Sequence, residues 1–415
     1  MCSRIRIKHF GGIKEGYRDN DSWIDIEKVT AFIGNQGSGK STVAKLVSTF
    51  TWLEKALHRG DYNIKYFTQR NRFTKILLPY HRLENYLIKE KNEIISEIEY
   101  EGKSFDIQFK KGALEVNAKT SQSYSLPQIM YVPAERNFIA YVKNTKELKL
   151  SSDSLQDFLS EFNKAKENIK GFISLPINDT NLQYDKLNDI LSVKGGDYKV
   201  RLSEASSGFQ SVVPLYIVSE YLAKSIQEKE SYQSQIMSIE ERERFQKDIQ
   251  NIYKNEDLTE EQRRIAISAL ASRFNKTSFI NIVEEPEQNL FPSSQEKMLE
   301  SLVAFNNYNE HNKLIITTHS PYLINHIGLL VKAGNLYDAG SFDKKEIEKI
   351  IPEKASIKNK QVAIYQFNEK DGTITRLPDY NGIPDDDDFL NEKLAESNDN
   401  FAELLDIQQK ASRCK

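Results

Sequence analysis

The stretch GNQGSGKS, from Gly34 to Ser41, has the residue types and the spacing that bind phosphate groups. Its glycines allow the backbone to turn N–H groups inward, toward phosphate oxygens. We expect the Lys40 ammonium to reach the β- and γ-phosphates of a nucleotide and the Ser41 hydroxyl to bind Mg²⁺. The full set predicted to bind the nucleotide is Gly34, Asn35, Gly37, Ser38, Gly39, Lys40, Ser41 and Thr42.

Two adjacent carboxylates, Glu284 and Glu285, follow the apolar residues INIV. A carboxylate at the end of a buried strand can hold the Mg²⁺ shell through water, and the next one can orient or deprotonate an attacking water. We assign the metal role to Glu284 and the water-activating role to Glu285. The alternative is a strand that ends in two solvated glutamates.

His319 occupies a similar place, after the apolar run KLIITT and before Ser-Pro. A histidine there can donate a hydrogen bond to a γ-phosphate and so report its presence. A structural histidine is the alternative, and we favour the catalytic sensor.

A second helix N-terminus with small residues, Ser206-Ser207-Gly208, precedes the apolar helix predicted from FQSVVPLYIVSEYL. Such an N-terminus attracts anions. One nucleotide does not need two such sites from one chain. We therefore predict that Ser207 and Gly208 complete the pocket of a second subunit.

The elements around these residues indicate an α/β fold. VTAFI before the glycine-rich loop predicts a buried strand, and the segment after it predicts a helix. Three more apolar strands suit the core of an α/β sheet, at residues 128–133, 278–283 and 313–318. Alternating segments at residues 4–10 and between about 95 and 118 predict a small antiparallel sheet.

The segment from about 225 to 275 is densely charged and predicts a helical insertion, with a capping box at Thr259 and Gln262. We interpret it as packed surface helices, with an extended coiled coil as the alternative. Residues 1–334 then form the main domain. Residues 335–415 form a C-terminal extension with one strand, the acidic run Asp385 to Asp388 and a final helix, as a possible partner-docking region.

Composition limits the function. The 415 residues are 39% hydrophobic and 28% charged, and no apolar stretch is long enough to span a membrane. The N-terminus has no apolar signal core and Cys2 and Cys414 lie near the ends, so we expect a cytoplasmic protein. A net charge of −3 argues against DNA binding by the whole chain. We interpret the basic, aromatic segment 65–75 as a basic edge whose aromatic residues belong to the core, with a nucleic-acid surface as the alternative.

The motifs GNQGSGKS, SSGFQ, EEPE and TTHS, in this order, resemble those of the ABC-type ATPase heads of the SMC and OLD families. The resemblance implies a P-loop ABC-type ATPase head, with an antiparallel β subdomain, that binds ATP and Mg²⁺. Such heads form homodimers that sandwich two ATPs, with Ser207 and Gly208 touching the γ-phosphate in trans. Gln210 matches the last position of the SSGFQ motif.

Two departures from the motif pattern of these families indicate which of their members the chain resembles most. The interval from Gly208 to Glu284 is long for a transporter head, and no long coiled-coil arm separates the glycine-rich loop from SSGFQ. EEPE, together with ASSG and YVPAERN, looks most like anti-phage defence ATPases of the Septu and retron-associated PtuA type, and less closely like AriA of PARIS. In the YVPAERN loop, either Glu135 or Arg136 senses the metal and phosphate, or the two stabilise a turn.

This resemblance implies a slowly hydrolysing ATPase, in a homodimer or higher homo-oligomer, that acts as sensor and scaffold for a separate nuclease or toxin effector. Two alternatives stay open. One is a DNA-repair or chromosome-associated ATPase that acts directly on DNA. The other is a nucleotide-gated module in which ATP is a structural ligand.

Overall fold

The computed structural model describes residues 2–120, 124–142, 152–227, 239–255 and 275–413, and residues 258–259, 262–263, 266–267 and 270. Its main sheet has seven strands, and the first five of them run parallel. Parallel strands present their carboxyl ends at one edge, which is where open α/β sheets bind ligands. In spatial order the strands are β10 (Pro127–Val132), β15 (Ser278–Glu284), β16 (Lys313–Thr318), β4 (Val29–Gly34), β17 (Val362–Phe367), β18 (Thr373–Arg376) and β2 (Gly16–Tyr17).

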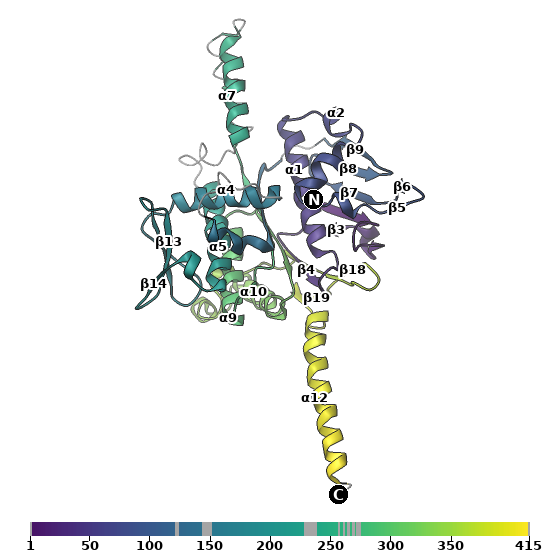
Figure 1. Ribbon diagram of the computed structural model, residues 1–415, viewed down its shortest axis with the longest axis vertical. Helices are drawn as coiled ribbons and strands as arrows, with labels where there is room; N and C mark the ends of the chain where they lie inside the picture. The colour runs from purple at the N-terminus through teal and green to yellow at the C-terminus, as the bar shows by residue number, and fades with distance from the viewer. Residues whose placement is uncertain are drawn as a thin grey trace.

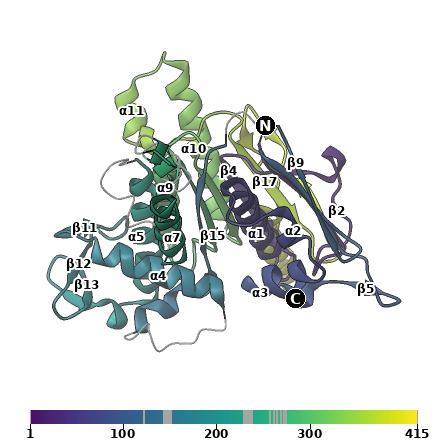
Figure 2. The same cartoon turned by 90° about the horizontal axis from the view of Figure 1, so that it is seen from above.

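Helix α1 (Lys40–Arg59) lies between one face of the main sheet and a five-stranded antiparallel sheet (Figure 2). The helix is apolar on both sides, so it packs in the middle of three layers. The antiparallel sheet predicted from the alternating segments is confirmed. Its strands are β3 (Ile24–Asp25), β1 (Arg4–Lys8), β7 (Glu97–Glu101), β8 (Phe105–Lys110) and β9 (Ala113–Ala118), with α2 (Ile64–Phe67), α3 (Leu78–Tyr80), β5 (Lys89–Glu90) and β6 (Glu93–Ile94) nearby.

The opposite face of the main sheet is covered by α5 (Ser207–Gln227), α9 (Pro292–Asn306) and α10 (Pro321–Ala339). Side chains alternate along β4, so Ala31 and Ile33 join this second core while Phe32 faces α1. Next to α4 (Asp153–Glu167) lies a four-stranded antiparallel sheet that the sequence did not predict. Its strands are β11 (Phe172–Ser174), β12 (Asn181–Asp185), β13 (Ile190–Lys194) and β14 (Lys199–Arg201).

Strand β17 belongs to the main sheet, although it lies beyond residue 334, where we placed the end of the main domain. It pairs in parallel with β4 over six residues, and all six of its side chains are buried. The ring of Phe367 packs edge-on against Phe32 with centroids 5.6 Å apart. The sheet therefore does not end at the predicted boundary, because β4 needs a partner strand on its second side.

Two helices, α7 (Ile239–Lys254) and α12 (Phe389–Arg413), extend from opposite sides of the body (Figure 1). The predicted capping box is present, with Gln262 N donating to Thr259 Oγ1 at 3.2 Å. Most of the other half of the predicted hairpin lies outside the described residues. The acidic run ends as a helix cap, since Asp388 Oδ1 accepts from Leu390 N at 2.8 Å.

The remaining α-helix and β-strands are α11 (Lys344–Glu348), β19 (Asp379–Tyr380) and β20 (Ile383–Pro384). Within the part of the chain that the structure describes, no helix combines the length and hydropathy needed to cross a membrane.

Candidate functional site

The glycine-rich loop connects the end of β4 to the start of α1, as the motif predicts. Gly34, Gly37 and Gly39 have φ angles of 140°, 75° and 105°, a region that other residues rarely adopt. A Cβ added at Gly39 would lie 2.8 Å from Ile13 Cγ1, whereas one at Gly37 would meet nothing within 4 Å. The loop is therefore packed on its inner side and open around Gly37. We call residues 34–41 the P-loop.

Lys40, the first residue of α1, folds back over the P-loop. Its Nζ atom donates to the carbonyl oxygens of Gly34 and Asn35, both at 2.8 Å. Burial lowers the pKa of the Lys40 ammonium to about 8, and the carboxylates of Glu285 and Glu287 oppose that shift. A lysine has three N–H donors, so one remains for a further oxygen.

The P-loop fits a nucleoside triphosphate. Ser38 Oγ is buried and has no hydrogen-bond partner among the described residues, which is unfavourable unless a ligand supplies one. Gly39 is the N-cap of α1 without a side-chain cap, so the N–H groups at Ser41 and Thr42 lie at an uncapped helix N-terminus.

The residues also fit Mg²⁺. This ion binds through one or two side chains together with phosphate oxygens and water, so it needs no cluster of acidic residues. The described residues contain no group of three or more His, Cys, Asp or Glu side chains that could hold a metal. Ser41, after β4, and Glu284, at the end of β15, lie at the same edge of the main sheet, where the hydroxyl could bind the ion and the carboxylate could hold its shell through water.

Glu284 is the last residue of β15 and is buried, with 5% of its surface exposed. Its Oε2 atom accepts a hydrogen bond from Ala134 N at 3.2 Å. The strand therefore does not end in two solvated glutamates, which was the alternative interpretation.

Glu285 follows in a strained backbone conformation, with φ at 43°. Its N–H donates to the Thr317 carbonyl at 2.9 Å, which anchors it to β16. Its Oε1 atom lies 3.3 Å from Nε2 of His319. The hydrogen bond from His319 is the main cause that lowers the pKa of the Glu285 carboxyl. The structure thus brings together the two residues predicted to be catalytic.

Glu287, which the sequence analysis did not single out, fixes the main chain at His319. Its Oε1 atom accepts from His319 N and from Thr318 Oγ1, both at 2.8 Å. Burial raises the pKa of the Glu287 carboxyl. The available signal was the third acidic residue in EEPE, although a glutamate after proline is common on surfaces.

Ser207 and Gly208 are the first residues of α5, on the face of the sheet opposite α1. Ser207 is exposed, while a Cβ at Gly208 would lie 3.0 Å from the Asn289 carbonyl oxygen. Gln210 is buried, and its Nε2 atom donates to the Ala205 carbonyl at 3.0 Å. Gln210 therefore holds the turn before α5, and Ser207 remains accessible to a second molecule.

The two charged residues of the YVPAERN loop, Glu135 and Arg136, lie in different surroundings. Glu135 forms an ion pair with Arg82 at 3.1 Å, with about half of each side chain exposed. Arg136 is 0% exposed and donates to the Glu284 and Glu285 carbonyl oxygens at 2.6 and 2.5 Å. Arg136 thus lies inside the site and Glu135 at its margin.

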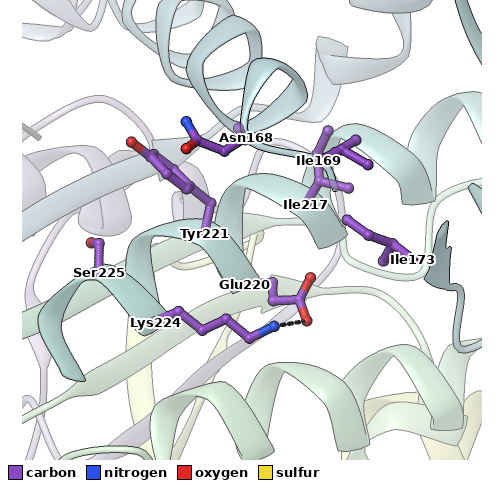
Figure 3. Close-up of a pocket in the computed structure, with 9 residues that line it drawn as sticks. Asn168, Ile169, Ile173, Ile217, Glu220, Tyr221, Lys224 and Ser225 are labelled. Carbon is purple, nitrogen blue, oxygen red and sulfur yellow. Dashed lines mark hydrogen bonds and ion pairs between the residues drawn. The ribbon is translucent and has the colours of Figure 1, made fainter. Parts of the chain in front are cut away.

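A cavity of about 210 Å³ lies between α4 and α5 (Figure 3). It is lined by Ile169, Ile173 and Ile217 and by the ion pair of Lys224 with Glu220, whose charged atoms are 2.7 Å apart. None of the predicted site residues lines this cavity. The candidate nucleotide site is the open edge at the P-loop.

The parallel strand order and the glycine-rich loop between β4 and α1 define an α/β P-loop fold. The family described as "AAA ATPase domain" matches residues 259–324, a segment that contains Glu284, Glu285 and His319. No curated protein sequence matches the chain.

Solved structures similar to the chain include SMC heads and an ATP-binding cassette. An SMC head domain from Thermotoga maritima is 12% identical, covers 92% of this chain and 100% of its own, and has a TM-score of 0.38. An SMC head bound to the C-terminal domain of ScpA, from Pyrococcus furiosus, is 11% identical over 90% of this chain and 95% of its own, with a TM-score of 0.37. A nucleotide-free ATP-binding cassette from an ABC transporter is 10% identical over 92% of this chain and 93% of its own, with a TM-score of 0.29.

Proposed function

We propose that this chain binds ATP with Mg²⁺ and hydrolyses the γ-phosphate bond. The observation that carries the proposal is the pairing of Glu285 with His319 at 3.3 Å, at the sheet edge that also holds Lys40. An ionised carboxylate at that place is an acceptor for the proton of an attacking water.

The residues divide the work as follows. Lys40 and the P-loop N–H groups bind the β- and γ-phosphates, and Ser41 and Glu284 hold the metal ion. Mg²⁺ neutralises charge on the phosphate oxygens when it is bound. Glu285 accepts the proton of the attacking water, and His319 orients Glu285 and donates toward the γ-phosphate.

We further propose that the active unit is a homodimer or higher homo-oligomer with ATP at the interface. The exposed position of Ser207, at the N-terminus of a helix on the face opposite α1, supports this arrangement. A helix N-terminus stabilises an anion that is presented by another molecule. Each pocket then contains the P-loop of one chain and the SSGFQ segment of the next.

The motif resemblance supports a role as a cytoplasmic sensor and scaffold in an anti-phage defence complex of the PtuA type, with a separate nuclease or toxin effector. Direct action on DNA has less support. Phe67 and Phe73 of the basic segment are 1% and 2% exposed, so their rings serve the core and are not available for stacking on bases.

Purified protein tests the core of this proposal. Steady-state ATP hydrolysis that is lost in Glu285→Gln supports it, and a parent chain that binds no ATP contradicts it. Phage plating on cells that carry the gene with its neighbours tests the defence role, with Lys40→Ala as the inactive control. Tight, salt-sensitive DNA binding by the isolated chain would favour the DNA-acting alternative.

A further inference from the structure

Arg136 is a fully buried charge whose partners lie on three separate parts of the site. Its Nη1 and Nη2 atoms donate to the Glu284 and Glu285 carbonyl oxygens. Its Nε atom donates to the carbonyl oxygen of Ser211, the fifth residue of α5, at 3.2 Å. One planar guanidinium therefore joins the end of β15, the Glu285 backbone and the helix that begins at Ser207.

All of these acceptors are main-chain carbonyl oxygens, and Arg136 Nη1 also donates to the Pro133 carbonyl at 3.3 Å. The guanidinium is rigid and forked, so it fixes the relative positions of the backbone segments it bonds. Burial lowers the pKa of Arg136 to about 10, which leaves it charged at neutral pH. A buried charge requires these bonds, so the segments cannot separate without a large penalty.

A second contact joins the same two regions. Asn289 Nδ2, in the loop after Glu285, donates to Ser211 Oγ at 3.2 Å. Gly208 lies so close to the Asn289 carbonyl that an added Cβ would be 3.0 Å away. The start of α5 therefore cannot shift without moving the loop that carries Glu285.

We propose that Arg136 is a positioning residue that couples the two halves of the composite site. When Ser207 docks against the nucleotide of a neighbouring chain, the first two turns of α5, which include Ser211, are fixed. Through Arg136 those turns then hold the strained backbone of Glu285 in this chain. The inference rests on the proposed function, and it predicts that hydrolysis in one pocket depends on occupancy of the other.

The test compares Arg136→Lys and Arg136→Gln with the parent in the full-length chain. Binding of a fluorescent ATP analogue should stay within about twofold, because Arg136 does not contact the P-loop. The kcat should fall about 10- to 100-fold, as expected when a reacting group is displaced slightly. A sigmoidal ATP dependence in the parent should become hyperbolic. Arg82→Gln is the matched control, because it removes an exposed charge beside the same loop and should change none of these values.

The Ser211→Ala variant is an independent test, because it removes only the hydrogen bond between the Ser211 hydroxyl and Asn289. It should weaken the cooperativity while keeping kcat within about threefold of the parent. Thermal unfolding shows whether the Arg136 variants are folded, and if they are not, Ser211→Ala decides the outcome alone.

The outcomes separate the coupling from the function on which it rests. A parent that does not hydrolyse ATP, or a Glu285→Gln variant at the parent rate, overturns the proposed function. A parent that hydrolyses ATP with a hyperbolic dependence overturns the coupling only. The coupling is also overturned if Arg136→Lys folds and keeps the kcat and the cooperativity of the parent. If the Arg136 variants do not fold, unchanged cooperativity in Ser211→Ala overturns it instead.

Discussion

Nε2 of His319 and Oε1 of Glu285 lie 3.3 Å apart, although the two residues come from the ends of different strands. The register of β15 against β16 creates this pair, because Glu284 lies opposite Thr317. Glu285 comes directly after Glu284, and His319 comes two residues after Thr317. The hydrogen bond keeps the Glu285 carboxylate ionised by lowering its pKa. The residue that we propose as proton acceptor and the residue that we propose as phosphate sensor thus share one contact.

Glu285→Gln should keep ATP bound while slowing hydrolysis by about 10²- to 10⁴-fold, because an amide keeps the shape but accepts no proton. Single-turnover hydrolysis measures the chemical step directly. Glu310→Gln, on an exposed turn, is the control and should behave as the parent. A parent-like single-turnover rate in Glu285→Gln would exclude it as the water-activating residue.

His319→Ala should move the acidic limb of the kcat/KM profile to higher pH. The pKa of Glu285 is held down chiefly by the bond from His319, so its loss lets that pKa rise and protonation begins at a higher pH. The residual kcat/KM of the variant, measured across pH, gives the position of the acidic limb. An acidic limb at the same pH as in the parent contradicts this role.

ATP binding should take up protons near pH 8. The pKa of Lys40 is lowered to about 8 by burial, and phosphates raise it again because they favour the ammonium form. Lys40 should therefore gain up to about half a proton on binding at pH 8, and affinity should fall as pH rises further. Calorimetry in two buffers of different ionisation enthalpy measures the uptake. In Lys40→Arg, where the side chain stays charged, the uptake should vanish.

Lys40→Ala and Ser207→Arg should each be inactive alone and partly active when mixed. The first loses the P-loop cation, and the second places a bulky side chain at the N-terminus of α5. A mixed dimer contains one pocket with an intact P-loop and an intact Ser207. If gel filtration shows mixed dimers and the mixture is no more active than the better variant, then pockets are not shared.

Phe367→Ala should destabilise the folded chain by about 3–5 kcal/mol, because it removes a fully buried ring from β17. Phe342→Ala is the control, since 53% of its surface is exposed and the change should stay within about 0.5 kcal/mol. Urea unfolding gives both values. Equal stability of the two variants would mean that β17 is not part of the main domain.

The P-loop and the strands before Glu284 and His319 were predictable because each signal is local. The spacing of the glycines, and an apolar run with the residue that follows it, are each patterns that span only about ten consecutive residues. The structure places Gly34, Lys40, Glu284 and His319 at the strand and helix ends that these patterns predict.

The unpredicted features depend on contacts between distant segments. Arg136 is separated from Ser211 by 75 positions and from Glu285 by 149, and nothing in YVPAERN indicates those carbonyl partners. The sheet of β11 to β14 was missed because its strands are only three to five residues long and because two of them, β12 and β14, are mostly polar. The place of β17 could not be found from VAIYQF alone, since an apolar strand carries no information about its neighbour.

The insertion of β17 beside β4 has a consequence during translation. Strand β4 is synthesised before both of its neighbours, because β16 and β17 are made more than 250 residues later. Until then β4 has two open edges of unpaired backbone groups, which can pair with another chain. The nascent chain therefore carries an aggregation-prone strand while those residues are made, and the sheet around the P-loop is complete only when Phe367 has emerged.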